Sequence, residues 1–361
     1  MKKTLNLFWF LAILLLNQAF SQSLIAVESN GATSYTQNFE QAIGMASSGS
    51  IIYLPGGTFS QGSAIIDKKL TILGVGHHPD STLATNQTII AGDIALLEGA
   101  SETHLEGLYI TNNISVAYQN KVDNLVIRRC SVNDITANGS HWSQADHDST
   151  YSYNWQIIHN VIRNNVNFGN LTAFTFKGNI IKGNMAYAFL GGTFENNVFL
   201  YNSASNHLID ELRFCTFKNN IFLHTWELSY PGYACSGGVP CGSYNNTFLN
   251  NSFCMGGQNL YLENGTASVA LNNKYDALIT ESLVNATENV FNYSGNYHIH
   301  PNLNSSLVGT DGLELGIYGG NDVYKEGAVP HNPHIYFKNI APSTTPDGML
   351  NVNIKVNAQN N

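Results

Sequence analysis

A short pattern of apolar and polar residues recurs along the middle of the chain. It reads Thr-Phe-Lys-Gly-Asn-Ile-Ile at residues 175–181, Thr-Phe-Glu-Asn-Asn-Val-Phe at 193–199 and Thr-Phe-Lys-Asn-Asn-Ile-Phe at 216–222. Within each repeat Phe, Ile or Val alternates with Thr, Lys or Asn, which is the periodicity of a β-strand. With looser matches included, the repeats are anchored about 23 residues apart on average, at positions 107, 130, 160, 179, 197, 220 and 246.

The spacing of these repeats varies, which excludes a solenoid built from one fixed unit. It favours a coiled chain whose turns share strands but differ in the length of their loops. The Asn at the break between two strands can pass amide hydrogen bonds from coil to coil as a ladder, and Asn tolerates the left-handed backbone of a sharp bend. We therefore predict an all-β fold, a right-handed parallel β-helix with Phe176, Phe194 and Phe217 in its interior.

Both ends of the repeat region carry patterns suited to capping. Residues 38–46 place apolar side chains on one face of a short helix, and Asn38 with Gln41 forms an N-terminal capping pair. Near the C-terminus, apolar residues at alternate positions from 350 to 358 predict a strand that pairs with residues 334–340. We expect an N-terminal capping helix and a C-terminal β-hairpin that covers the last coil. For residues 334–361, a small separate sorting or attachment module is the alternative.

Two further segments resemble a known superfamily. The sequence Ile-Tyr-Leu-Pro-Gly-Gly-Thr-Phe at residues 52–59, directly after the predicted helix, resembles the opening of proteins with the pectin-lyase-like β-helix fold. Residues 309–320 are similar to the closing segment of secreted bacterial β-helix proteins. The resemblance covers roughly residues 24–335 and implies that residues 22–333 form the β-helix. It implies no single activity, because this fold carries lyases, hydrolases, epimerases and adhesins.

The first 21 residues have the features of a secretory signal peptide. Lys2 and Lys3 form a basic start, residues 5–16 are almost wholly apolar, and cleavage is expected after Ser21. The apolar part is too short for a stable membrane span, and no later segment is long and apolar enough to provide one. We therefore expect a secreted protein, extracellular, periplasmic or on the outer surface, and a monomer.

Charge narrows the choice of partner. Only 11% of the residues are charged, and loss of Lys2 and Lys3 with the signal peptide leaves 14 basic residues against 25 acidic ones, a net charge of −11. This sign argues against nucleic acid as a partner, because phosphate attracts basic proteins. A neutral polysaccharide, or an acidic one bridged by a metal such as calcium, agrees better with the charge.

The five cysteines lie in a chain that is expected to leave the reducing cytosol. Cys235 and Cys241 flank the flexible segment Ser-Gly-Gly-Val-Pro, and we predict a disulfide between them. Cys130, Cys215 and Cys254 fall in strand-like runs, where buried thiols are expected, and disulfide pairing is the alternative.

Motifs that would indicate a particular carbohydrate-active enzyme are absent. Polygalacturonase-like hydrolases of this fold carry paired Asp residues and a Gly-His-Gly segment, and pectate-lyase-like enzymes carry an Arg-x-Pro-x-x-Arg-type segment, neither of which occurs here.

One polar loop remains as a candidate site. The step from Cys130 to Asn160 is longer than the usual coil, and its surplus contains the segment 141–151. Two imidazoles and two carboxylates there could bind a metal ion or act as an acid–base pair, with two aromatic rings for sugar stacking. The candidate catalytic residues are His141, Asp146, His147 and Asp148, and the candidate binding residues are Trp142 and Tyr151. A solvated loop is the alternative.

A second large loop, residues 225–242, holds the predicted disulfide together with Trp226, Tyr230 and Tyr233. These rings are a candidate sugar-binding platform, and packing over the edge of a coil is the alternative. The leading hypothesis is a secreted β-helix protein that binds carbohydrate or another extracellular polymer. The alternatives are a polysaccharide lyase or glycoside hydrolase that uses the 141–151 loop, and a structural or adhesive surface protein.

Overall fold

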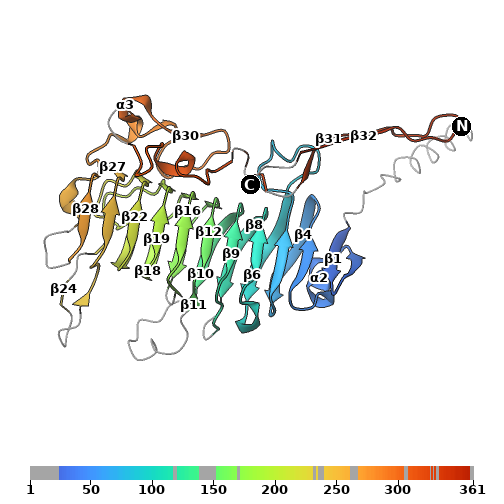
Figure 1. Ribbon diagram of the computed structural model, residues 1–361, viewed down its shortest axis with the longest axis horizontal. Coiled ribbons are helices and arrows are strands. Elements are labelled where there is room, and N and C mark those ends of the chain that lie inside the picture. The colour runs from blue at the N-terminus through green and yellow to red at the C-terminus, as the bar shows by residue number, and fades with distance from the viewer. Residues whose placement is uncertain are drawn as a thin grey trace, which may run out of the picture.

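The chain is built mainly from short strands that stack into long parallel sheets (Figure 1). The computed structural model describes residues 24–116, 120–137, 152–168, 171–230, 233–234, 240–260, 267–304, 308–325, 327, 329–330 and 333–357. The arrangement is consistent with a parallel β-helix, in which one coil of the chain pairs with the next.

Within the described residues, sheet A has 12 strands. It opens with two antiparallel pairings among β2 (Ala32–Thr36), β1 (Ile25–Ser29) and β3 (Ser50–Tyr53). It continues in parallel through β5 (Leu70–Leu73), β7 (His104–Glu106), β9 (Val126–Arg128), β12 (Gln156–Ile158), β16 (Thr175–Lys177), β19 (Thr193–Glu195), β22 (Thr216–Lys218), β26 (Thr247–Leu249) and β28 (Val269–Leu271).

Sheet B has 14 strands within the same residues. Its early strands are long, namely β4 (Gly57–Ile66), β6 (Thr88–Leu96), β8 (Tyr109–Val116) and β10 (Ser131–Ala137). In later coils the long strand is divided into shorter segments. The first segments are β13 (Val161–Ile162), β17 (Ile180–Ile181), β20 (Val198–Phe199), β23 (Ile221–Phe222) and β27 (Ser252–Phe253). The remaining segments of sheet B are β11 (Ser152–Tyr153), which follows β10, β14 (Val166–Phe168) and β15 (Leu171–Thr172), which both follow β13, β18 (Met185–Leu190), which follows β17, and β21 (Ile209–Arg213), which follows β20.

The interior is filled by columns of aromatic rings, as predicted. Phe176, Phe194 and Phe217 are paired in register and fully buried. Their ring centroids lie 5.3 and 4.4 Å apart, and the column continues to Phe248 at 5.2 Å. Burial of these rings in successive coils holds sheets A and B together.

A ladder of asparagine side chains runs along the corner between sheets A and B. Each Asn donates its Nδ2 to the Oδ1 of the Asn in the next coil at 2.9–3.1 Å, in the order Asn160, Asn179, Asn197, Asn220, Asn251 and Asn273. The ladder is therefore confirmed, but the predicted anchors at positions 107 and 246 are wrong. Tyr109 pairs with Ser131, so Leu108 rather than Gly107 corresponds to Cys130. Thr247 pairs with Thr216, so the repeat starts five residues later and Asn251 takes the ladder position.

The residue before each ladder position has a left-handed backbone, and we call this pair of positions the ladder corner. The residues are Gly107, Arg129, His159, Gly178, Asn196, Asn219, Asn250 and Asn272, with φ between 49° and 72°. A second left-handed column, the loop corner, precedes the strands of sheet A. Its residues are Glu102, Asn124, Asn154, Ala173, Gly191, Phe214, Asn245 and Ala267, with φ between 48° and 64°. Asn and Gly are frequent in both columns because they tolerate this conformation best.

After β28 the chain turns back along the outside of the ladder corner (Figure 1). We call the described part of residues 277–330 the return segment. It includes the antiparallel pair β29 (Leu283–Asn285) and β30 (Asn296–Ile299), and the helix α3 (Pro301–Asn304). The return segment contacts the ladder corner of successive coils in reverse order, from the coil of Asn250 to that of Arg129. The hydrogen bonds are Asn250 Nδ2 to Val308 O (3.0 Å), Thr310 N to Asn219 Oδ1 (3.0 Å), Asn196 Nδ2 to Gly316 O (3.2 Å), His159 Nε2 with Asp322 O (2.9 Å) and Arg129 Nη1 to Val329 O (2.9 Å).

The return segment also buries the outer face of the first segments of sheet B. Outward-facing Ile180, Val198 and Ile221 form a second hydrophobic cluster with residues of the return segment that include Leu315 and Ile317. These two-residue strands are therefore buried on both faces, which explains why their sequences are continuously apolar.

The N-terminal capping helix is confirmed as α2 (Phe39–Met45). Asn38 Oδ1 accepts a hydrogen bond from the backbone N–H of Gln41 at 2.8 Å, and Phe39, Ala42 and Ile43 are buried. No helix in the described part of the chain is both long and apolar enough to cross a membrane.

The C-terminal hairpin is also present, as β31 (His334–Ile340) paired with β32 (Val352–Asn357). Its predicted place over the last coil is wrong. The return segment carries the chain back to the first coils, so Pro333 and His334 lie beside Leu24 and Tyr53, and the hairpin projects from that end (Figure 1). Almost all of its side chains are exposed.

Candidate functional site

The structure describes only part of the two predicted site loops. His141, Trp142, Asp146, His147, Asp148 and Tyr151 lie outside the described residues. In the second loop, the backbones of β24 (Tyr233–Ala234) and β25 (Pro240–Cys241) pair antiparallel. Trp226 and Tyr230 are described in full and identify the region where a site can be built.

The structure likewise describes only some of the cysteines. Cys130, Cys215 and Cys254 are free thiols, as predicted, and burial raises their pKa values to about 12, 12 and 11. They are therefore inert packing groups rather than nucleophiles. The described residues form no disulfide among themselves, and because Cys235 lies outside them, the Cys235–Cys241 bond stays a prediction.

Sheet B positions the segment that carries Trp226 and Tyr230. Ile209 N donates to Leu228 O at 3.0 Å, and Tyr230 N donates to Asp210 O at 3.1 Å. Leu228 is buried in the interior, so the backbone on either side of it is held against β21. This fixes the neighbouring side chains without requiring a regular strand.

A histidine and a glutamate meet at this point. His207 Nε2 lies 2.9 Å from Glu227 Oε2, and the rings of His207 and Tyr230 have centroids 4.0 Å apart. The side chain of His207 is only 12% exposed and that of Glu227 is 28% exposed. Trp226 and Tyr230 are 39% and 46% exposed. We call these four residues the His207 cluster.

A second imidazole, that of His224, contacts the backbone of the His207 cluster. His224 Nε2 lies 3.1 Å from the backbone oxygen of Glu227, and its ring stacks on Tyr201 with centroids 5.6 Å apart. Burial lowers the pKa of His224 to about 4, so this ring is neutral at physiological pH. It holds the backbone of Glu227 in place and keeps the carboxylate beside His207.

Charged residues flank the cluster on β21. Arg213 forms an ion pair with Glu211, and its guanidinium lies 5.7 Å from the centroid of the Tyr244 ring. The surface therefore combines exposed aromatic rings with fixed donors and acceptors. It can stack on an apolar ligand face and hydrogen-bond to hydroxyl groups.

The sequence predictions include Trp226 and Tyr230 but miss His207. A signal was available, because the step from Asn197 to Asn220 is 23 residues whereas that from Asn179 to Asn197 is 18. His207 lies in the surplus, and a surplus in a coil places extra residues on the outside.

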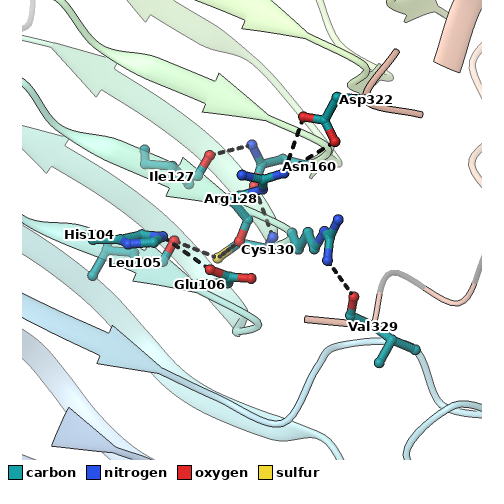
Figure 2. A network of polar contacts seen from close by, with 10 residues as sticks. His104, Leu105, Glu106, Ile127, Arg128, Cys130, Asn160, Asp322 and Val329 are labelled. Carbon is teal, nitrogen blue, oxygen red and sulfur yellow. Dashed lines mark hydrogen bonds and ion pairs between the residues drawn. The ribbon is translucent and has the colours of Figure 1, made fainter. Parts of the chain in front are cut away.

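A separate charged network has a structural role. Arg128 Nη2 lies 3.2 Å from Asp322 Oδ2, and His104 Nε2 lies 3.2 Å from Glu106 Oε2. Figure 2 shows both pairs and the nearby Val329. The neighbouring Arg129 is 1% exposed, and burial lowers its pKa. Because Asp322 and Val329 belong to the return segment, the ion pair of Arg128 with Asp322 and the hydrogen bond from Arg129 Nη1 to Val329 O fasten that segment to the coil of Arg129.

Within the described residues, no three His, Cys, Asp or Glu side chains are grouped closely enough to hold a metal ion. Comparison with protein-family models, with curated proteins and with solved structures found no match to this chain.

Proposed function

We propose that this chain is a secreted, right-handed β-helix protein of the pectin-lyase-like type, and that it binds a neutral extracellular polysaccharide through the His207 cluster. The observation that carries the proposal is the exposed Tyr230 ring, which contacts the His207 ring of the hydrogen-bonded pair His207 and Glu227, together with the exposed Trp226, the chain neighbour of Glu227. Exposed rings stack on the apolar faces of sugars, and a fixed polar pair bonds to their hydroxyls.

The shape of sheet B supports an extended ligand. Ser115, Thr136 and Asn167 are in register on successive strands and face outward, and β18 continues the sheet to β21 beside the cluster. These side chains are polar and uncharged, and they offer hydroxyl and amide groups along the long axis of the molecule.

Charge supports a neutral ligand rather than an acidic one. The chain has a net charge of −9, and removal of Lys2 and Lys3 with the proposed signal peptide makes it −11. An acidic polymer would be repelled at long range unless cations intervened.

The proposal is tested by affinity electrophoresis of residues 22–361 in gels that contain neutral β-glucan, xylan or mannan, with pectate and alginate as acidic counterparts. We expect retardation by at least one neutral polymer, and a weakening of about tenfold or more in Trp226→Ala and Tyr230→Ala, since each removes a stacking ring. Tyr35→Ala is the matched control, because Tyr35 is 63% exposed on β2 and far from the cluster in the sheet order.

Three outcomes would contradict the proposal. Retention that is unchanged in both cluster variants would place binding elsewhere. Release of unsaturated product or reducing ends would favour an enzyme that uses the 141–151 loop. Absence of retention by every polymer would favour a structural or adhesive role.

A further inference from the structure

A pocket of about 450 Å³ lies between the return segment and the loop that includes His78 and Ser81. One wall includes Ile180, on the outer face of β17, so the pocket opens on the first segments of sheet B rather than beside β21. We call it the tyrosine pocket, and its aromatic lining consists of Phe291, Tyr293, Tyr297, Tyr318 and Tyr324. Its volume is within the range of about 300–1,000 Å³ that is typical of small-molecule sites.

The rings of the tyrosine pocket are held in place by one another. Phe291 contacts Tyr293 edge-on, with centroids 4.9 Å apart, and stacks on Tyr297 at 6.0 Å. Tyr318 stacks on His298 at 3.7 Å. The pocket is therefore preformed, and a ligand would not have to order its walls on binding.

Two of the hydroxyl groups are already used. Tyr293 Oη lies 3.0 Å from Nδ1 of the buried His77, and Tyr297 Oη donates to Asn292 O at 3.0 Å. Tyr324 differs, since its hydroxyl forms no hydrogen bond with any described residue while its side chain lines the pocket. This oxygen is also not among the fully buried polar atoms that have no partner, so a ligand hydroxyl would take the place of solvent as its partner.

The lining carries no fixed charge. None of the described lining residues is Asp, Glu, Lys or Arg. Burial raises the pKa of Tyr293 to about 12 and also raises the pKa values of Tyr297 and Tyr324, so all three phenols stay protonated near neutral pH. A charged ligand would lose hydration on entry without gaining an opposite charge.

We infer that the tyrosine pocket binds a small neutral sugar, a monosaccharide or disaccharide unit, between its aromatic rings. Ring faces contact the C–H groups of the sugar, while the Tyr324 hydroxyl and the side chains of Asn292 and Asn296 bond to its hydroxyls. The inference goes beyond the proposed function, because this site is separate from the His207 cluster and does not depend on it.

The test is ligand-observed NMR followed by calorimetry on residues 22–361, with glucose, galactose, mannose, xylose and their disaccharides as probes. We expect millimolar binding of at least one neutral sugar, and a weakening of about tenfold in Tyr324→Phe, which removes one hydroxyl and keeps the ring. Tyr336→Phe is the control, because Tyr336 is exposed on the hairpin. Galacturonate and glucosamine should bind more weakly than the neutral sugars.

The Trp226→Ala, Tyr230→Ala double variant separates this inference from the proposed function, since it should leave binding of the small sugar unchanged. The inference is overturned if no neutral sugar binds at millimolar concentration, if a charged sugar binds more tightly, or if Tyr324→Phe binds as the unsubstituted protein does. Loss of small-sugar binding in the double variant would also overturn it, by assigning that binding to the His207 cluster.

Discussion

The two left-handed corners of the coil differ in how much the length of the chain between the sheets can vary. At the ladder corner two residues join sheet A to sheet B, a left-handed one and a ladder one, as in Gly178-Asn179 and Asn219-Asn220. Before the loop corner the connection varies greatly in length, and residues 138–151 and 231–242 both precede a loop-corner residue in chain order, Asn154 and Asn245. The varying period of the repeats therefore arises almost entirely on one side of the coil.

Hydrogen bonding explains the constant length of the ladder corner. An Asn inside the ladder, such as Asn197, uses its side-chain amide fully: its Oδ1 accepts from Asn179, and its Nδ2 donates to Asn220 Oδ1 and to Phe176 O. An inserted residue would break these bonds. The return segment covers the same corner from outside. A change in the length of the ladder corner would therefore disrupt both the asparagine ladder and the contacts with the return segment.

The interior of the loop corner is filled differently. The residue before each strand of sheet A is, in successive coils, Trp155, Phe174, Gly192, Cys215 and Asn246. Each coil fills this position differently, with contacts only between particular neighbours, such as the Phe174 ring over Gly192 and the hydrogen bond from Cys215 N to Asn246 Oδ1 at 3.0 Å. The lesson is that loops and candidate binding groups gather where the corner is not part of a continuous hydrogen-bonded column.

The largest predicted effect comes from interrupting the ladder. Asn197→Leu leaves the buried N–H of Asn179 and the buried oxygen of Phe176 without their partners. We expect the free energy of unfolding to fall by about 3–5 kcal/mol, since each unsatisfied buried group costs about 1–3 kcal/mol. Urea denaturation measures it.

The control for the ladder variant is Asn245→Ala at the loop corner, where the side chain is exposed. Only the left-handed strain of about 1–2 kcal/mol is expected there. Equal losses in the two variants would show that the corners do not differ as described.

A smaller effect is expected at the loop corner itself from Gly192→Ala. A Cβ at this position would lie 2.0 Å from the Phe174 ring, which is buried between Phe176 and Phe194. We expect destabilisation of about 3 kcal/mol, the upper end of typical overpacking costs. Thermal and urea unfolding measure the loss. Gly191→Ala is the control, since the nearest atom to its Cβ is 3.8 Å away, and it should cost less; a reversed order would refute this account of the packing.

The third prediction concerns pH and the covered side of the ladder corner. Burial lowers the pKa of His159 to about 4; Asp322 opposes this shift, while Arg129 and Arg128 add to it. The unfolded chain, with a pKa near 6.5, binds a proton between pH 6.5 and 4 that the folded chain does not. Stability is therefore lost as the pH falls through this window, by about 2 kcal/mol at pH 5 from this group.

His159→Asn tests this dependence on pH, because Asn occupies the same corner position as Asn196 and Asn219. Urea midpoints at pH 7 and pH 5 should differ less in the variant than in the unsubstituted protein, by about 2 kcal/mol once converted to free energy. An unchanged difference would mean that His159 does not couple the return segment to pH.

Much of the coiled architecture could be predicted because it depends on periodicity. The inward Phe176, Phe194 and Phe217 and the amide ladder through Asn160, Asn179 and Asn197 follow from side-chain alternation and repeated position. The return segment could not be predicted, because it binds the ladder corner largely through backbone oxygens such as those of Asp322 and Val329. Backbone groups leave no pattern in a sequence.

The candidate site could also be predicted only in part from the sequence. The exposed Trp226 and Tyr230 could be identified by residue type and loop position. His207 could not be assigned as their neighbour, since its contact with Glu227 spans 20 residues and depends on the pairing of residues 228–230 with β21. The tyrosine pocket was missed for a stronger reason, because it joins His78 to a segment more than 200 residues later.

The return segment changes how the stack holds together as a whole. In an ordinary array of repeats each unit touches only its two neighbours, and the ends fray independently of the middle. Here the return segment is a single stretch of chain that contacts the coil of Arg129 and also the coils of His159, Asn196, Asn219 and Asn250. We therefore expect the coils from Arg129 to Asn250 to unfold together while these contacts are intact, rather than one at a time. The return segment follows the coils in the chain, so it is synthesised after them. The coils can therefore be joined by these contacts only after the return segment has been made.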